Sequence, residues 1–392
     1  MRTLLEIQRF LNQIFKWVAS FGLVAFSANS ISETAAYDNS RSPPFEAPKE
    51  GRVISRVSIH PDGEHWIFTE AVDKTGGVMT NIVWLFHLPT RKLRRYQLPE
   101  DHQYGYVRFS PSGRFVVMAR YPNQRDGSEA EYRRVISEVE LVMMNMDGSE
   151  FKVLSVPKGM LLMPVVSPDE KKVLYSISKK MRDPGERTLL TNFDIYEFDI
   201  ESGKNYPYSR SLTFYSFHSI DYISNDEILI GAYGLLAGGS VPSHTPSIHA
   251  SEVYYLKRGS EEGPRALFSM FKSANDPTVD AKGNIFFEAY VDNVGISIVR
   301  HSSEKSTSIW RLPKSVTDIS DICVDPKGKY LAATYRFHVP YRSPSRTRGI
   351  GSVAVFDLKK QIWFDAFLHQ PVVSQPIKVL PPKRSSAVNH LN

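Results

Sequence analysis

The sequence predicts an all-β protein, a six-bladed β-propeller in which each blade has four strands. Three observations lead to this fold class. A turn-forming tetrad recurs six times at intervals of 45 to 57 residues, and each copy lies between two short apolar runs. Aromatic residues, which favour pleated surfaces, make up 12% of the chain. A single four-stranded blade cannot bury both of its faces, so the blades are expected to pack on one another.

The tetrads have the chemistry of hairpin connections. Three copies are clear and three are weaker: His60-Pro61-Asp62-Gly63, Ser110-Pro111-Ser112-Gly113 and Ser167-Pro168-Asp169-Glu170, then 224–227, 280–283 and 325–328. Proline presets a turn dihedral, Asp and Asn favour turns, and glycine accepts a positive φ. Each tetrad is therefore expected to join the first and second strands of one blade.

Apolar runs around the tetrads predict the strands. Runs such as 57–59 and 322–324 come before a tetrad, and the runs that come after the tetrads are 66–68, 115–118, 173–175, 228–230, 285–287 and the less apolar 330–333. Third strands with their own turns are expected at 141–148, 194–199, 253–256 and 353–358, each followed by a fourth strand. A β-sandwich has no reason to repeat its turn and a β-solenoid usually has shorter repeats, so the pattern favours the propeller.

The chain divides into four parts. Residues 1–30 have a basic start, an uncharged apolar run from Trp17 to Ala28 and then small residues, which predicts a signal peptide cleaved near Ala28 to Ser30. A helix of this length spans about 18 Å, less than the hydrocarbon core, although a retained anchor or a buried helix stays possible. A linker (31–50), the propeller (51–371) and a basic, proline-containing tail (372–392) follow. We therefore expect a periplasmic or secreted protein without a stable transmembrane span.

The phrases Ser167-Pro168-Asp169 and Leu141 to Ser149 (LVMMNMDGS) resemble the repeats of the TolB-like, or WD40-like, six-bladed β-propeller family. The resemblance covers about residues 51 to 371 and implies the propeller fold. TolB itself carries a sizeable α/β domain ahead of its propeller, whereas only residues 31–50 lie between the predicted signal peptide and the first blade here. The resemblance therefore implies a TolB-like propeller and leaves a role in the Tol system open.

Long loops are expected between the second and third strands at 120–135, 179–192, 233–251 and 336–352. The chain has a net charge of +6, and the segments 120–134, 179–187 and 336–348 carry +1, +2 and +4, while residues 51–371 as a whole sum to +3. A basic docking face is therefore predicted, formed by Arg120, Arg133, Arg134, Arg182, Arg187, Arg336, Tyr341, Arg342, Arg346 and Arg348. Alternatively, these charges only keep long loops solvated.

The sequence favours an exported, non-enzymatic binding or scaffold protein, which we expect to be a monomer. Its partner would be a protein of the cell envelope or another acidic polymer, and not nucleic acid, because the excess charge is small. The common hydrolase, zincin and nucleotide-binding motifs do not occur, so no catalytic residue, metal or cofactor is predicted. The single cysteine, Cys323, excludes an intrachain disulfide.

Two alternatives stay open. The first is a propeller enzyme, a lyase or hydrolase that acts on an acidic saccharide in the central channel. It could use histidines as metal ligands, and His218, His244, His249 and His338 are the candidates. The second is the isolated propeller of a prolyl-oligopeptidase-like protein, which would act as a gate.

Overall fold

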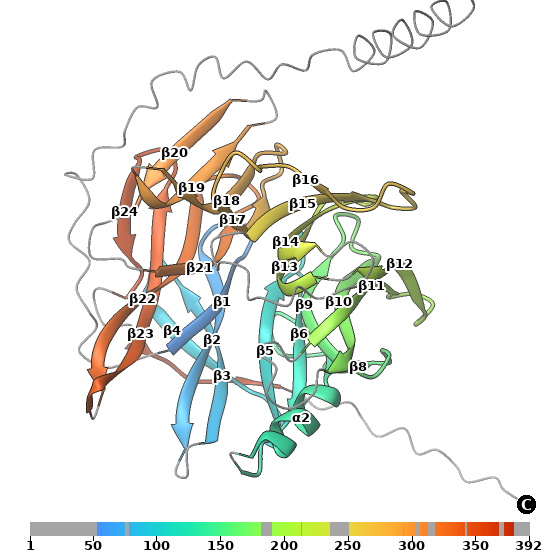
Figure 1. The fold of residues 1–392 in the computed structure, drawn as a ribbon. Coiled ribbons are helices and arrows are strands. Elements are labelled where there is room, and N and C mark those ends of the chain that lie inside the picture. The colour runs from blue at the N-terminus through green and yellow to red at the C-terminus, as the bar shows by residue number, and fades with distance from the viewer. Residues whose placement is uncertain are drawn as a thin grey trace, which may run out of the picture. The chain divides into compact units, whose positions relative to one another are not determined.

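The computed structural model describes residues 53–74, 78–126, 128–181, 190–212, 214–235, 251–292, 294–302, 306–312, 318–341, 343–367 and 372–379. These residues form six antiparallel sheets in a ring, and this confirms the predicted six-bladed β-propeller (Figure 1). The predicted signal peptide and linker lie outside the described residues. No helix among the described residues is long and apolar enough to cross a membrane.

Each blade is built from four consecutive strands. The first three blades consist of β1 (Val53–Ile59), β2 (His65–Lys74), β3 (Val78–His87) and β4 (Lys92–Gln97); β5 (His102–Phe109), β6 (Phe115–Pro122), β7 (Glu140–Asn145) and β8 (Lys152–Leu154); and β9 (Met160–Val166), β10 (Lys172–Met181), β11 (Leu190–Asp199) and β12 (Asn205–Leu212). The last three consist of β13 (Phe214–Ser224), β14 (Glu227–Leu235), β15 (Ser251–Lys257) and β16 (Arg265–Ala266); β17 (Ser273–Val279), β18 (Ile285–Val291), β19 (Gly295–His301) and β20 (Thr307–Arg311); and β21 (Asp318–Val324), β22 (Tyr330–Tyr341), β23 (Ser343–Asp357) and β24 (Ile362–Asp365). The first strands of neighbouring blades contact one another around the ring, so they surround the central axis.

All six predicted tetrads join the first and second strands of a blade. In the first, second and sixth tetrads the glycine N–H donates to the carbonyl of the first residue at 2.8 Å. Tetrads of neighbouring blades also touch, since Ser112 N–H donates to Glu170 Oε1 at 2.6 Å. One side of the propeller is thus a rim of short, mutually braced turns, called here the tetrad face.

Six apolar clusters hold the ring together, one between each pair of neighbouring blades. The continuous apolar run at the start of β6 shows how the sequence serves two of them. Phe115, Val117 and Ala119 pack against the third blade, while Val116 and Met118 pack against the first. A strand that is buried on both faces must be apolar at successive positions, because alternate side chains point to opposite faces.

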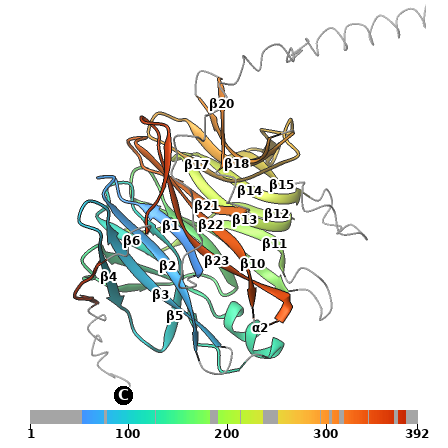
Figure 2. The ribbon, with the colours of Figure 1, turned by 90° about the vertical axis from the view of Figure 1, so that its left-hand side faces the viewer.

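Each blade takes its four strands from one continuous stretch of the chain, and an apolar cluster joins the sixth blade to the first. Strand β1 contacts β21, β22 and β23 of the sixth blade, which lie beside the first blade in Figure 2. Trp66, fully buried in the first blade, meets the ring of Tyr330 edge-on at 6.5 Å. The tail then crosses to the first blade, where β25 (Val372–Val373) and β26 (Ile377–Lys378) pair in parallel with β4.

The side opposite the tetrads differs from the prediction in two places. The segment 336–352 is not a loop, because β22 and β23 continue through it as an extended hairpin. The segment 120–135 contains the start of a helix, α2 (Glu129–Ser137), capped by Ser128, whose hydroxyl accepts the N–H of Glu131. In Figure 1, α2 and the β2–β3 and β22–β23 hairpins extend toward the same side of the propeller. We call this side the hairpin face.

Candidate functional site

The candidate site is the central channel, where strained residues of the innermost strands converge. Five of the six innermost strands contain a non-glycine residue with φ between 46° and 57°: Arg56, Tyr106, Met163, Asp276 and Asp321. In the first, second, fifth and sixth blades the strand ladder shifts register there, as at a β-bulge. All five residues line a narrow constriction of about 20 Å³. Backbone strain at a repeated position is a feature of functional sites.

The spacing of these residues repeats that of the tetrads. Each lies five positions before the second residue of its tetrad, and the fourth blade has Ile220 at the equivalent position. In that blade the register shift falls earlier, between Phe217 and Ser219. Sequence reasoning missed this set of residues, although the tetrad spacing contained the signal that identifies it.

A network of charged and aromatic side chains joins four blades at the constriction. The Arg56 guanidinium forms an ion pair with Asp321, and the Arg56 N–H donates to Asp321 Oδ2 at 3.1 Å. The Asp321 N–H in turn donates to Asp276 Oδ2 at 2.9 Å. Arg56 also lies 4.8 Å over the ring of Tyr106 in the second blade. This chain of contacts links the fifth, sixth, first and second blades around the axis.

Burial shifts the titration of the channel groups. Burial and then the neighbouring Asp321 charge raise the pKa of Asp276 to about 6, although Arg56 opposes the shift. Burial and the Arg56 charge lower the pKa of His218 to about 4, so this imidazole is neutral at physiological pH. Burial also raises the pKa of Asp221, against the effect of Arg108, whose guanidinium lies 3.4 Å away.

A polar cavity of about 340 Å³ opens above the constriction, toward the hairpin face. Apart from Gly105, every residue of its wall has a polar side chain: Ser55, Arg56, Thr69, Asn81, Tyr106, Tyr121, His218, Asn275, Asp276, Ser320 and Asp321. Asn81 Nδ2 donates to the Tyr121 hydroxyl at 2.9 Å. A Cβ at Gly105 would lie 2.3 Å from that hydroxyl, so only glycine leaves room for the Tyr121 side chain in the wall.

A second cavity of about 400 Å³ opens on the tetrad face and has a more apolar wall, which includes Ile59, Phe109, Val166 and Cys323. The constriction lies between the two cavities, because Arg56 is shared with the upper one and Arg108 with the lower one. The upper cavity can hold a polar group through hydroxyl, amide, imidazole and carboxylate contacts.

In the described part of the predicted basic face, two arginines have carboxylate partners. Arg120 Nε donates to Glu140 at 2.7 Å, and Arg134 pairs with Glu131 at 2.7 Å and with Glu138 at 2.8 Å. The other members fall into two groups: Arg133 is half-buried on α2, and Arg336, Tyr341, Arg346 and Arg348 lie on the β22–β23 hairpin. Arg182, Arg187 and Arg342 lie outside the described residues. The structure thus brings four of the predicted residues onto one hairpin.

Of the four candidate histidines, His218 lies in the wall of the upper cavity. His338 is on β22, where its backbone pairs with Gly349. His244 and His249 lie outside the described residues. The histidine cluster that the structure does describe, which contains His60 and His65, was not predicted.

Comparison with known proteins identifies no family for this chain. No family model matches the chain and no curated protein matches it, so the resemblance to TolB-like repeats stays a prediction. Among solved structures, the chain is similar to a prolyl endopeptidase (9% identity, 80% of this chain and 42% of that chain, TM-score 0.48). It is also similar to the oligogalacturonate lyase of Vibrio parahaemolyticus (12% identity, 80% of this chain and 78% of that chain, TM-score 0.48). A third similar structure is the β-propeller domain of the trilobed protease of Pyrococcus furiosus (11% identity, 79% of this chain and 94% of that chain, TM-score 0.43). The chain thus spans less than half the length of the prolyl endopeptidase.

Proposed function

We propose that this protein is an exported, non-enzymatic TolB-like propeller that docks an acidic partner, a protein of the cell envelope, on its hairpin face. The observation that carries the proposal is the difference between the two faces. Both faces open into a cavity, but the tetrad face consists of short braced turns around a more apolar cavity, whereas the hairpin face combines long connections with a polar one. Long connections on a rigid scaffold are where binding usually occurs.

The charges of the β22–β23 hairpin support an acidic partner. Between residues 336 and 356 the sequence contains four arginines and no aspartate or glutamate. Near α2, Arg120 and Arg134 are paired with carboxylates of their own blade. The hairpin therefore supplies most of the excess positive charge, and an acidic partner is attracted to it first.

The polar cavity supports a partner that inserts a hydrophilic group. Ligand cavities of a few hundred Å³ are usually lined by apolar and aromatic side chains, which suit apolar ligands. This cavity instead offers hydroxyls such as those of Ser55 and Ser320, the Asn275 amide and the His218 ring. Such a wall suits a polar chain segment of the docked partner, held by hydrogen bonds.

Binding to a defined acidic polypeptide tests the proposal. Immobilised polyglutamate is probed with the protein that lacks residues 1–30, at about 0.05 M and about 0.5 M NaCl, because salt screens exposed charges. The test variant is Arg346→Ser/Arg348→Ser, and the matched control is Lys282→Ser/Lys327→Ser on two tetrads, which also removes two positive charges. We expect salt-sensitive binding that the arginine variant weakens at least about tenfold and the lysine control leaves unchanged. Equal losses in both variants, or no binding by the unmodified protein, would contradict the proposal.

A second candidate function is an enzyme that acts on an acidic saccharide in the channel. The observation that favours it is Asp276, a buried carboxyl whose pKa is raised to about 6 and which lies in the wall of the polar cavity next to Asp321. Incubation with polygalacturonate, followed by an assay for new reducing ends, tests it. Cleavage that is lost in Asp276→Asn and kept in Arg346→Ser/Arg348→Ser would replace the docking proposal with the enzymatic one.

A further inference from the structure

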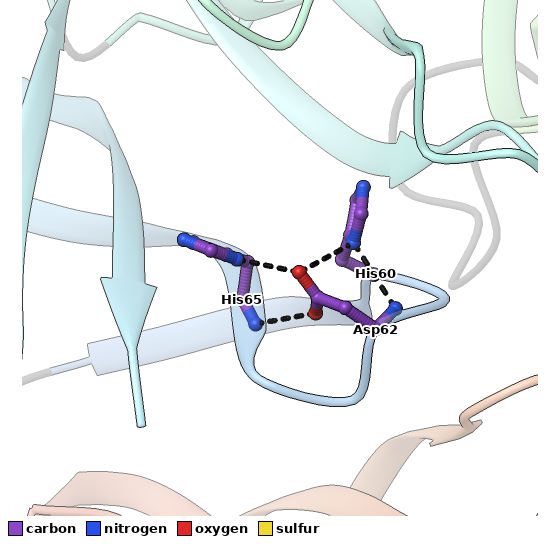
Figure 3. Close-up of side chains that lie close together, drawn as sticks. All are labelled: His60, Asp62 and His65. Atoms are coloured by element: carbon purple, nitrogen blue, oxygen red, sulfur yellow. Dashed lines mark hydrogen bonds and ion pairs between the residues drawn. The ribbon is translucent and has the colours of Figure 1, made fainter. Parts of the chain in front are cut away.

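The first tetrad differs from the others because it brings two imidazoles to one carboxylate. His60 opens the tetrad, Asp62 is its third residue and His65 begins β2, and Figure 3 shows both rings directed at the Asp62 side chain. His60 Nδ1 lies 2.9 Å and His65 Nδ1 lies 2.7 Å from Asp62 Oδ2. The three side chains are 17% to 35% exposed, so the cluster is accessible from the tetrad face.

The backbone fixes the Asp62 carboxylate so that one oxygen faces both rings. Oδ1 accepts the backbone N–H of Glu64 at 2.7 Å and that of His65 at 2.9 Å. The backbone thus engages Oδ1, and Oδ2 is presented to the imidazole nitrogens.

His60 Nδ1 cannot satisfy both of its contacts at once, because it has one in-plane position for either a lone pair or a bound cation. This nitrogen accepts the backbone N–H of Asp62 at 3.2 Å, which requires a lone pair on the nitrogen. The same nitrogen lies 2.9 Å from the Asp62 Oδ2 anion, and a lone pair facing an anion is repulsive. A proton on the nitrogen would satisfy the carboxylate but oppose the N–H. A metal ion between the nitrogen lone pair and the carboxylate oxygen would remove this repulsion, and the nitrogen would give up only the longer, 3.2 Å contact with the Asp62 N–H.

Packing holds both rings in place. His60 meets Phe109 edge-on at 5.1 Å, and it lies so close to Gly113 of the next blade that a Cβ there would be 1.8 Å from Nε2. His65 stacks on His87 at 4.5 Å, and His87 Nδ1 lies 2.7 Å from Thr90 Oγ1. Rings that are fixed before a metal arrives are typical of metal sites, where surrounding contacts orient the ligands.

We propose that His60 Nδ1, Asp62 Oδ2 and His65 Nδ1 form a binding site for zinc(II) on the tetrad face. The three atoms lie within 4.8 Å of one another. Tetrahedral ligands at about 2.0–2.1 Å from zinc are about 3.3 Å apart, so each of the two histidine nitrogens needs to move away from Asp62 Oδ2 by only about half an ångström. Two imidazoles and one carboxylate select a borderline first-row dication over Mg²⁺ or Ca²⁺, which prefer all-oxygen sites. Three protein ligands leave the fourth position for water or an exogenous ligand.

Variants that copy residues of the other tetrads test the site without disturbing the turn. His60→Ser recreates the first residue of the second and third tetrads, and His65→Phe recreates Phe115 at the matching position of the second blade. Asp169→Asn, in a tetrad without histidine, is the matched control for Asp62→Asn, since Asp169 Oδ1 also accepts bonds within its own turn. Zinc chloride is titrated by calorimetry into chelator-treated protein, and cobalt(II) absorption reports the ligand geometry.

We expect one zinc ion per chain and a tetrahedral cobalt spectrum. Zinc binding should weaken more than about 100-fold in each of the variants His60→Ser, His65→Phe and Asp62→Asn. Loss of a residue that only orients a metal ligand typically costs about 10- to 100-fold, and Asp169→Asn should bind zinc as the unmodified protein does. Circular dichroism that matches the unmodified protein shows that each variant has folded. Absence of zinc binding by the unmodified protein, or binding that persists in His60→Ser/His65→Phe, for example at His244 and His249, would overturn the assignment.

Discussion

Replacing Asp276 by asparagine should stabilise the protein at neutral pH. Asp276 is 5% exposed, and it lies in the constriction beside the Asp321 carboxylate. Asparagine keeps the size of the side chain, and its carbonyl can still accept the Asp321 N–H. Asparagine also tolerates the positive φ of 46° at this position. The substitution therefore removes one buried negative charge and little else.

The magnitude follows from the titration of this carboxyl. Burial and Asp321 raise its pKa to about 6, whereas the ordinary value is 3.8. Because the native state holds the proton more tightly, the unfolding free energy falls as pH rises from about 4 to 6. The whole shift is worth about 3 kcal/mol, since each unit of pKa corresponds to about 1.4 kcal/mol. Above pH 6.5 Asp276→Asn should therefore be more stable by up to about 3 kcal/mol, with no gain near pH 4.

Urea unfolding followed by tryptophan fluorescence at pH 4 to 8 measures this difference. The unfolding free energy of the variant minus that of the unmodified protein, taken at each pH, gives the contribution of Asp276, because the other titrating groups are common to both proteins. The expected difference grows between pH 4 and 6 and is constant above. A difference that does not depend on pH, or a variant less stable at pH 7.5, would refute the description of a carboxyl destabilised by its neighbours.

Two further substitutions probe the buried ion pairs. Asp321→Asn should lower the unfolding free energy by about 1–3 kcal/mol at pH 7.5, as measured in the same urea assay. This loss is smaller than the roughly 3–5 kcal/mol usual for breaking a buried ion pair, because the Asp276 carboxylate can take the place of Asp321 beside Arg56. Glu197→Gln should cost about 3–5 kcal/mol in that assay, because the fully buried Glu197 accepts Arg258 Nη1 and Nη2 at 2.6 Å each and joins the third and fourth blades.

Both results have clear contrary outcomes. Asp321→Asn and Asp276→Asn should change the unfolding free energy in opposite directions, and equal signs would show that the two carboxylates have the same role. Glu261→Gln, an exposed glutamate in the turn before β16, serves as the control for Glu197→Gln. If these two variants lose the same stability, the pair with Arg258 does not hold the blades together.

The blades could be predicted because their signals are local. The proline, aspartate and glycine of the tetrads act within a few residues, and runs such as Phe115 to Ala119 reflect burial on both faces of a blade. The β22–β23 hairpin could not be recognised, because its outer half is rich in arginine and serine without apolar alternation. The helix α2 did have a signal, since Ser128 followed by Glu131 is the sequence pattern of a capping box, of which the structure forms the bond from the Glu131 N–H to the Ser128 hydroxyl.

The channel could not be predicted from composition or motif, because its residues come together only when the ring closes. Arg56 and Asp321 are 265 positions apart, yet they form an ion pair. The constant spacing of these residues from the tetrads can be read in the sequence. The β-bulge that turns each of their side chains toward the channel cannot. The histidines of the first tetrad were also visible, but their common carboxylate depends on the fold of the turn.

The central claim is that the hairpin face, and not the tetrad face, meets the partner. Hydrogen–deuterium exchange of the protein with and without saturating polyglutamate tests it most directly. We predict slower exchange in 336–357 and in the cavity wall around Tyr121, with the six tetrads unchanged. Protection confined to the tetrads, or spread evenly over both faces, would contradict the claim.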